Sequence, residues 1–242
     1  MDGWEGTVRV MKFENPACWR MVKNTLASQG GREMREEYQL HIQGILEDKR
    51  LPPIRGEKWY SNSQKKKQHL RQSVALGGFD SAKFKQDVEN IMDVVALFAR
   101  HVPGIQPSGL RQVGDRMVIE AGNRIFTPRH EAPTMQPAEV DRLMDENGFI
   151  EQVNRGDPGF VYGDENVVFY DMGVELTKVI RIEDISPQKL HVGDIVDVGF
   201  SVVGIGKGRD VKARVVMRNI TLLDARHTQV SEGRTGVEVC SY

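Results

Sequence analysis

The chain has 242 residues, 39% of them hydrophobic and 28% charged, with a formal net charge of -1. This composition is typical of a globular protein with a real core, in one large domain or two modest ones. No apolar run approaches the roughly 18 residues of a membrane span, and the first residues lack signal-peptide character, so we expect an intracellular protein of the nucleus or cytoplasm.

Charge and cysteine placement narrow the classes further. Residues 1–75 hold 14 Lys and Arg against 9 Asp and Glu, a net charge of +5, whereas residues 76–242 carry -6. This basic front and acidic back are the one compositional asymmetry that indicates an anionic partner. The cysteines, Cys18 and Cys240, lie near opposite ends with no C-x-x-C spacing, which argues against a thiolate metal site and against a disulfide framework.

The first residues predict a strand and then a helix. Residues 4–13 alternate apolar and polar side chains, the pattern of a short strand. Asn15 and Pro16 then provide an N-cap and a proline at the first helical position. We expect this helix to run to about residue 30, with inward-facing side chains Trp19, Val22 and Leu26.

Two more helices are expected before residue 103. One runs over residues 32–48 and is ended by the prolines at 52 and 53. The other starts at Asp80 or Ser81, ends near Arg100, and has the most regular apolar stripe of the chain. That stripe consists of Phe84, Val88, Ile91, Val94, Val95 and Phe98.

Between these two helices, residues 49–73 form a polar, basic segment. Basic side chains beside two aromatic rings can combine phosphate contacts with base stacking. The alternative is a solvated loop whose aromatic rings pack back onto the helices, and three successive lysines also fit part of a nuclear-localisation patch. The candidate nucleic-acid contacts here are Arg55, Lys58, Trp59, Tyr60, Lys65, Lys66, Lys67 and Arg71.

The composition changes in the middle of the chain, which suggests a domain boundary there. Residues 104–136 are rich in proline and glycine, typical of a connector, with a small hairpin predicted over 116–126 around residues 121–123. A short helix is expected over 137–147. Later residues read as β, with strands predicted at 160–162, 166–170 and 175–182. We therefore expect a domain over 1–103, a connector over 104–136, a β domain over 137–230 and a tail over 231–242.

A long antiparallel hairpin is predicted from Leu190 to Asp224. Two β-branched runs flank a glycine-rich tip at residues 204–208, and a strand rather than a helix follows, so these glycines belong to a turn and not to a phosphate loop. One hairpin face is basic, and three of its residues share parity in an unbulged strand. A solvated outer face fits equally well. The candidate contacts are Lys207, Arg209 and the three of shared parity, Lys212, Arg214 and Arg218.

Motifs for catalysis or metal binding are absent. The histidines have no metal-ligand helical spacing, and neither H-E-x-x-H nor G-x-S-x-G occurs. We therefore assign no catalytic residue, no metal and no cofactor. The histidines are His41, His69, His101, His130, His191 and His227.

Two resemblances add to this reading. Three ordered blocks, at residues 166–171, 190–196 and 215–224, resemble an uncharacterised, multicopy family of predicted proteins from mushroom-forming fungi, associated with mobile elements. That resemblance covers the C-terminal third and implies no activity. The segment over residues 192–196 resembles the first strand of an OB-fold. This resemblance implies binding of single-stranded nucleic acid through a basic, aromatic-lined face. The aromatic residues nearby are Phe169, Tyr170 and Phe200.

The sequence thus predicts an α+β protein with a helical N-terminal part and an antiparallel β C-terminal domain, expected as a small OB-like barrel. The leading function is non-enzymatic binding of single-stranded DNA or RNA. One alternative is a protein-interaction module that offers an exposed, uncharged hairpin edge over residues 215–223 to a partner strand. The other is an enzyme with a site at the junction over residues 103–137.

Overall fold

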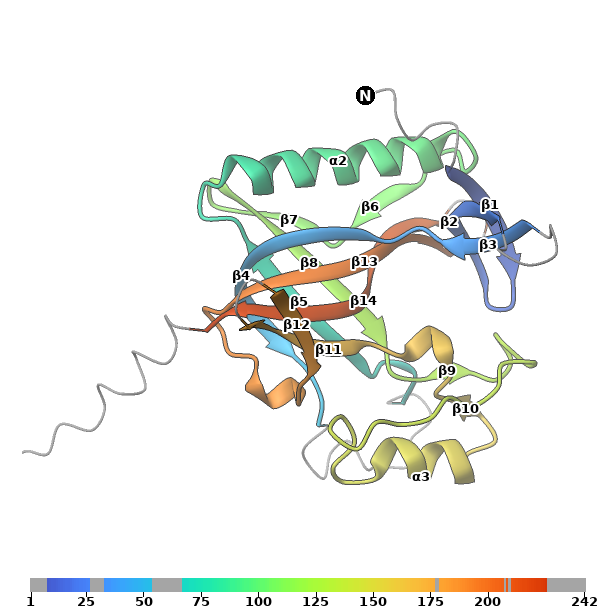
Figure 1. Cartoon of the computed structure of the whole chain (residues 1–242). Coiled ribbons are helices and arrows are strands. Elements are labelled where there is room, and N and C mark those ends of the chain that lie inside the picture. Colours follow the sequence, from blue (N-terminus) through green and yellow to red (C-terminus); the bar gives the residue numbers. More distant parts are fainter. Residues whose placement is uncertain are drawn as a thin grey trace, which may run out of the picture.

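A computed structural model (Figure 1) describes residues 8–26, 33–53, 67–176, 179–206, 208 and 210–225. Strands dominate these residues, with the α-helices α2 (Ala82–Ala99) and α3 (Phe149–Gly156) beside a large mixed sheet. The predicted α+β class with a helical N-terminal part is therefore wrong. The basic stretch 54–66, Lys207, Arg209 and the tail from residue 226 lie outside the described residues.

The N-terminal part is made of strands where two helices were expected. Its elements are β1 (Val8–Glu14), β2 (Ala17–Leu26), β3 (Glu33–Glu37), β4 (Leu40–Arg50) and β5 (Arg71–Gly77). The strand expected over 4–13 is confirmed in its described part, whereas the helices expected over 16–30 and 32–48 are wrong. β1, β2 and β3 pair antiparallel in sequence, and β4 pairs with β5.

Both strands were mistaken for helices because one inward position in each lacks the apolar side chain that a strand pattern predicts. In β4, the buried Ile42 and Leu46 are four residues apart, which mimics a helix, because Gly44 occupies the position between them. A Cβ at Gly44 would lie 3.1 Å from the Phe84 ring, so the missing side chain admits α2. In β2, the polar Arg20 is only 9% exposed and stands where a strand pattern calls for an apolar residue.

Helix α2 is confirmed where the sequence placed it. The Ser81 hydroxyl caps it by accepting a hydrogen bond from the Phe84 backbone N–H at 3.4 Å. Its buried stripe packs over β4 and β13 (Ile195–Ile205), and Figure 1 shows the helix lying across the top of the sheet. Phe98, a residue of this helix, is fully buried. The helix therefore closes one side of the core.

The region from Gln106 to Pro128 contains no hairpin at residues 121–123. Its strands are β6 (Gln106–Ser108), β7 (Leu110–Val113), β8 (Arg116–Arg124) and β9 (Thr127–Pro128). β8 runs straight through Gly122, where a Cβ would lie 2.9 Å from the Ser73 Cβ of β5. Gly122 allows β5 and β8 to approach closely and does not form a turn, so the predicted hairpin over 116–126 is wrong.

The next segment also differs from its prediction. The helix expected over 137–147 is not formed; α3 begins after Gly148, and the Asp145 carboxylate accepts from the backbone N–H groups of Ile150 and Glu151. The single strand expected over 175–182 is instead a hairpin, with the described strands ending at 176 and resuming at 179. The elements here are β10 (Phe160–Val161), η1 (Asp164–Asn166), β11 (Phe169–Leu176), β12 (Val179–Asp184) and η2 (Pro187–Lys189).

The long hairpin is confirmed as β13 and β14 (Lys212–Asp224), which pair antiparallel along their whole length. The register shifts between Gly199 and Phe200, where Asn219 and Met217 are their partners. Arg218 is therefore the extra residue of a β-bulge.

The sheet closes on itself around the core. β14 pairs with β13, β13 with β4, β4 with β5, and β5 with β8. The return passes through β7, which pairs with β8, and β6, which pairs with β14, on either side of Gly109. The Glu120 backbone N–H donates to the Gly109 carbonyl at 2.6 Å at this junction. Membership of the OB class stays a prediction.

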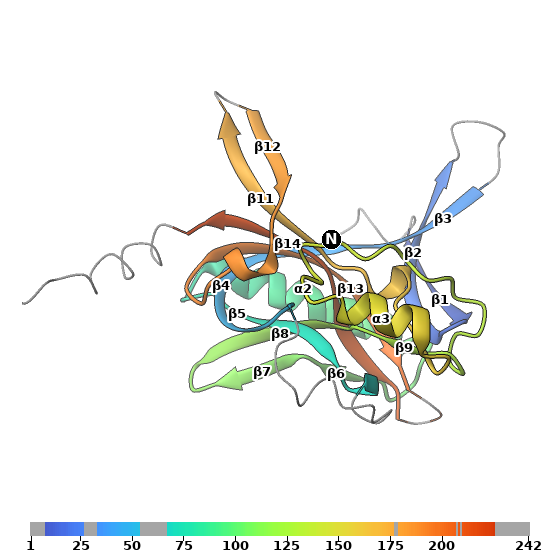
Figure 2. The same ribbon diagram turned by 90° about the horizontal axis from the view of Figure 1, so that it is seen from below.

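Segments before and after the proline-rich region share this sheet, because β4 pairs with β13. The predicted domain boundaries stay a prediction. The β11–β12 hairpin projects from the body in Figure 2. Within the described ranges, no helix combines the length and apolar character needed to cross a membrane.

Candidate nucleic-acid interface

Five arginines line one cavity, which we call the arginine pocket. It has a volume of about 280 Å³. β2, β5, β8, β13 and β14 contribute to its wall, so residues distant in sequence meet there. Cys18, Val203 and Val216 give it an apolar side, and burial raises the pKa of the Cys18 thiol, which stays neutral. The five arginines are Arg20, Arg71, Arg124, Arg214 and Arg218.

Two of these arginines are neutralised by carboxylates. Arg20 Nη2 lies 2.7 Å from Glu165 Oε2 and Arg20 Nη1 lies 3.3 Å from Glu37 Oε1. Arg218 Nη2 lies 2.8 Å from Glu37 Oε1, and its Nη1 donates to the Glu165 carbonyl at 3.0 Å. Burial alone would raise the pKa of Glu165, but the two guanidinium groups lower it. This network of four residues is electrically balanced, and Arg20, Arg218 and Glu165 of the network line the pocket.

The other three arginines of the pocket are only partly balanced by carboxylates. Arg71 and Arg124 are directly opposite each other across β5 and β8. Arg124 Nη1 is paired with Glu131 Oε2 at 2.6 Å. Among the described residues, neither Arg71 nor Arg214 has a carboxylate within ion-pair distance. Burial, and then repulsion from Arg214 and Arg124, lower the pKa of Arg71, and the Glu120 carboxylate partly opposes this shift.

Arg214 also has an unused donor. Its Nε is buried and has no hydrogen-bond acceptor among the described residues. A guanidinium presents its N–H groups in a planar fork that matches the oxygens of a phosphate. The arginine pocket therefore has a charge and hydrogen-bond donors that suit an anion.

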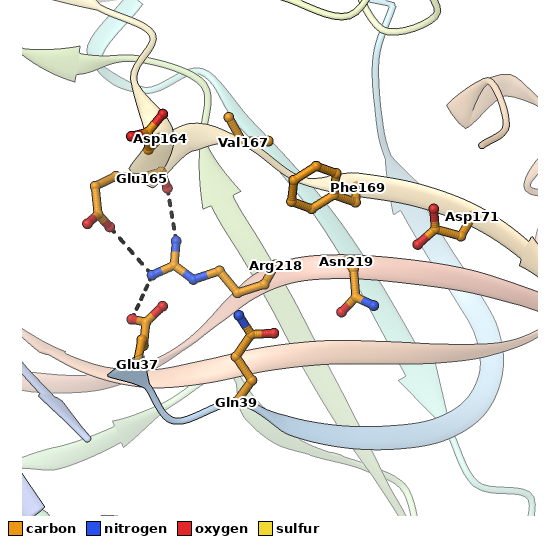
Figure 3. Close-up of a pocket in the computed structure, with 9 residues that line it drawn as sticks. All are labelled: Glu37, Gln39, Asp164, Glu165, Val167, Phe169, Asp171, Arg218 and Asn219. Atoms are coloured by element: carbon orange, nitrogen blue, oxygen red, sulfur yellow. Dashed lines mark hydrogen bonds and ion pairs between the residues drawn. The ribbon is translucent and has the colours of Figure 1, made fainter. Parts of the chain in front are cut away.

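A second cavity adjoins the first, and we call it the Phe169 pocket (Figure 3). Its volume is about 540 Å³, and it shares Glu165 and Arg218 with the arginine pocket. Phe169 is 64% exposed and is the large apolar side chain of its lining. The chain thus offers an aromatic face beside a cationic cavity.

Charge differs sharply between the two pockets. The Phe169 pocket is lined by Asp164 and Asp171 as well as by the balanced Glu37 and Glu165. Asp171 is opposite Asp184 across β11 and β12, and burial, then the Asp184 carboxylate, raise the pKa of Asp171. This pocket therefore disfavours phosphate and favours groups that donate hydrogen bonds.

The structure brings only part of the predicted contact set together. Arg71, Arg214 and Arg218 line the arginine pocket, and the shared face predicted for Arg214 and Arg218 is present there. Lys212 is exposed near the start of β14, outside the lining of the pocket. Lys67 is buried, with its Nζ 2.5 Å from Asp157 Oδ2. The other predicted contacts lie outside the described residues: Arg55, Lys58, Trp59, Tyr60, Lys65, Lys66, Lys207 and Arg209.

Two arginines of the pocket, Arg20 and Arg124, were not predicted as contacts from the sequence. Arg20 was placed on an expected helix, and Arg124 in an expected hairpin, whereas each belongs to a paired strand. The pairing of Arg71 with Arg124 depends on strand register, for which the sequence carries no local signal. In the part of the chain that the structure describes, no group of three or more His, Cys, Asp or Glu side chains could hold a metal ion.

Comparisons with known proteins identify no family for this chain. No protein-family model matches the chain, and no curated protein matches it. Among solved structures, the chain is similar to a single-stranded DNA-binding protein encoded by bacteriophage T7, with 10% sequence identity and a TM-score of 0.41. The match covers 85% of this chain and 97% of that chain. A likeness at this score assigns neither fold nor function, and the resemblance to fungal proteins stays a prediction.

Proposed function

We propose that this protein binds single-stranded nucleic acid, with the strand's backbone held at the arginine pocket. The observation that carries this proposal is the uncompensated charge of Arg71 and Arg214 in one cavity, beside a third arginine that Glu131 pairs. Like charges held together repel, and an anion relieves that repulsion as it binds. Phosphate is the anion that fits the paired forks of two guanidinium groups.

The neighbouring Phe169 pocket supports a single strand as the ligand. An exposed aromatic ring stacks on any base, and the carboxylates around it accept hydrogen bonds from base amino groups while repelling phosphate. Charge therefore separates the two parts of a nucleotide, with phosphate directed to the arginine pocket and a base directed to Phe169. A base must be unpaired and unstacked from its duplex partner to reach such a face.

The protein-interaction alternative loses its motivating feature. It requires an exposed, uncharged edge on β14 over residues 215–223. β11 pairs in parallel with residues 219–222 of that edge, and Arg218 reaches Glu37 and Glu165 beside it. The edge is thus paired over residues 219–222 and charged at Arg218, which disfavours recruitment of a partner strand.

The experiment is a binding titration of a labelled oligothymidine strand by fluorescence anisotropy, at low and at moderate salt. We expect binding at low salt that weakens as salt rises, because phosphate contacts release counterions. Arg214→Gln removes one uncompensated charge and is expected to weaken binding by about 1–2 kcal/mol, about 5- to 30-fold in Kd.

The matched control is Arg181→Gln, the same substitution on an exposed arginine of β12 that lines neither pocket. It should leave the dissociation constant unchanged within error. Absence of binding at low salt would overturn the proposed function, and equal losses for both variants would show that overall charge, and not the arginine pocket, drives binding.

A further inference from the structure

The arginine pocket holds a specific surplus of charge. Arg20 and Arg218 are balanced by Glu37 and Glu165, and Arg124 is paired with Glu131. Among the described residues, this leaves the guanidinium groups of Arg71 and Arg214 as the uncompensated charges. The pocket is thus short of about two negative charges.

An internal phosphate of a nucleic-acid strand carries one negative charge and is tethered to a sugar on both sides. A phosphate monoester at a strand end carries about -1.5 to -2 at neutral pH and is tethered on one side only. The surplus of two arginines therefore matches a terminal monoester better than an internal diester.

The shape of the pocket points the same way. Its volume of about 280 Å³ is bounded on one side by the apolar Val203 and Val216 and on another by the ion-pair network. A terminal phosphate enters such a cavity with one sugar, whereas an internal phosphate brings a sugar on each side.

Resting on the proposed function, we propose that the arginine pocket recognises a terminal phosphate monoester of a single strand. Arg71 and Arg214 bind its oxygens as a pair of forks. The same chemistry occurs at a 5′ and at a 3′ end, so both ends are tested.

The experiment compares three oligothymidine strands of equal length with an internal fluorescent label. One carries a 5′-phosphate, one a 3′-phosphate, and one hydroxyl groups at both ends. We expect one phosphorylated strand to bind about tenfold more tightly than the hydroxyl strand, the gain from one added charge-assisted pair of hydrogen bonds. Arg214→Gln and Arg71→Gln should remove this preference, and Arg181→Gln should retain it.

A second measurement uses the unmodified protein and needs no folded variant. Thymidine 5′-monophosphate and thymidine 3′-monophosphate compete against the preferred strand, with thymidine as the control. One monophosphate should displace the strand at concentrations where thymidine does not. Equal dissociation constants for all three strands, with strand binding intact, would overturn this inference and leave the proposed function standing; no binding of any strand overturns both.

Discussion

Glu165 is the residue on which the two pockets depend, because it lies in both linings and pairs with two arginines. Arg20 and Arg218 lower its pKa below the ordinary value of 4.5. A lowered pKa in the folded state means that the ionised carboxylate stabilises the fold at neutral pH, and that this contribution disappears as pH falls through the folded-state pKa.

Glu165→Gln is therefore expected to lower the free energy of unfolding at pH 7 by about 1–3 kcal/mol, a range reduced from that of a fully buried pair because the side chain is 29% exposed. The difference from the unmodified protein should be smaller at about pH 3 than at pH 7, because protonation of the carboxylate removes its ion pairs as pH falls. Urea unfolding at the two pH values measures it.

The control for this test is Glu14→Gln, in which a 72% exposed carboxylate paired with Lys12 loses its charge. Its effect should stay below about 0.5 kcal/mol at both pH values. A Glu165→Gln difference of the same size at pH 7 and at about pH 3 would contradict the ion-pair account, because only an ionised group changes between these conditions.

Phe169 is the residue that tests base contact. Phe169→Ala removes the stacking face and is expected to weaken single-strand binding by about 1–3 kcal/mol, the usual loss for one stacked base. Stability should change little, since the ring is 64% exposed. Ile182→Ala, at 66% exposure on β12, is the matched apolar truncation. Equal affinities of the Phe169 variant and the unmodified protein, measured by anisotropy, would exclude stacking at this site.

At the scale of elements, Gly109 is the junction that lets β6 and β7 close the sheet. Its φ of +98° is disfavoured for any side chain, and a Cβ there would lie 2.5 Å from the Glu120 carbonyl oxygen. Gly109→Ala is expected to destabilise the protein by about 3 kcal/mol or more, from backbone strain combined with this collision.

Gly114→Ala separates the two causes. Gly114 also has a positive φ, +64°, but a Cβ there would meet nothing within 4 Å. Only the backbone preference is lost, so a change of about 1 kcal/mol is expected. Thermal unfolding of both variants checks the comparison, and equal losses would contradict the role of Gly109 in closure.

Elements with an unbroken pattern could be predicted from the sequence. Helix α2 has a complete apolar stripe and a serine cap, and β13 and β14 have long β-branched runs, so all three were located. β2 and β4 could not be recognised, because a buried arginine at position 20 and a glycine at position 44 take inward positions that normally carry apolar side chains. Tertiary packing, and not local preference, determines those two residues.

The candidate site was less predictable than the fold. Parity along β14 placed Arg214 and Arg218 on one face, and Arg71 was chosen from a basic segment of the sequence. Their meeting with Arg20 and Arg124 follows from the pairing of strands across the closed sheet. Sequence reasoning also had no means to separate the balanced Arg218 from the uncompensated Arg214, because that difference arises from Glu37 and Glu165.

At the scale of the whole molecule, the charge asymmetry between front and back halves does not define the site. The arginine pocket takes Arg20 and Arg71 from the basic first 75 residues and its other three arginines from the acidic remainder. The fold concentrates positive charge in one cavity of a chain whose net charge is only -1. Local concentration of charge, and not net charge, is what steers a polyanion to its site.

The most direct test of the central claim is the salt dependence of strand binding by the unmodified protein and by the Arg71→Gln/Arg214→Gln double variant. Each phosphate neutralised on a single strand contributes about 0.7 to the slope of log affinity against log salt. The slope of the double variant should be smaller by about 0.7, because the two arginines bind one phosphate together. Equal slopes for the two proteins would contradict phosphate binding at the arginine pocket.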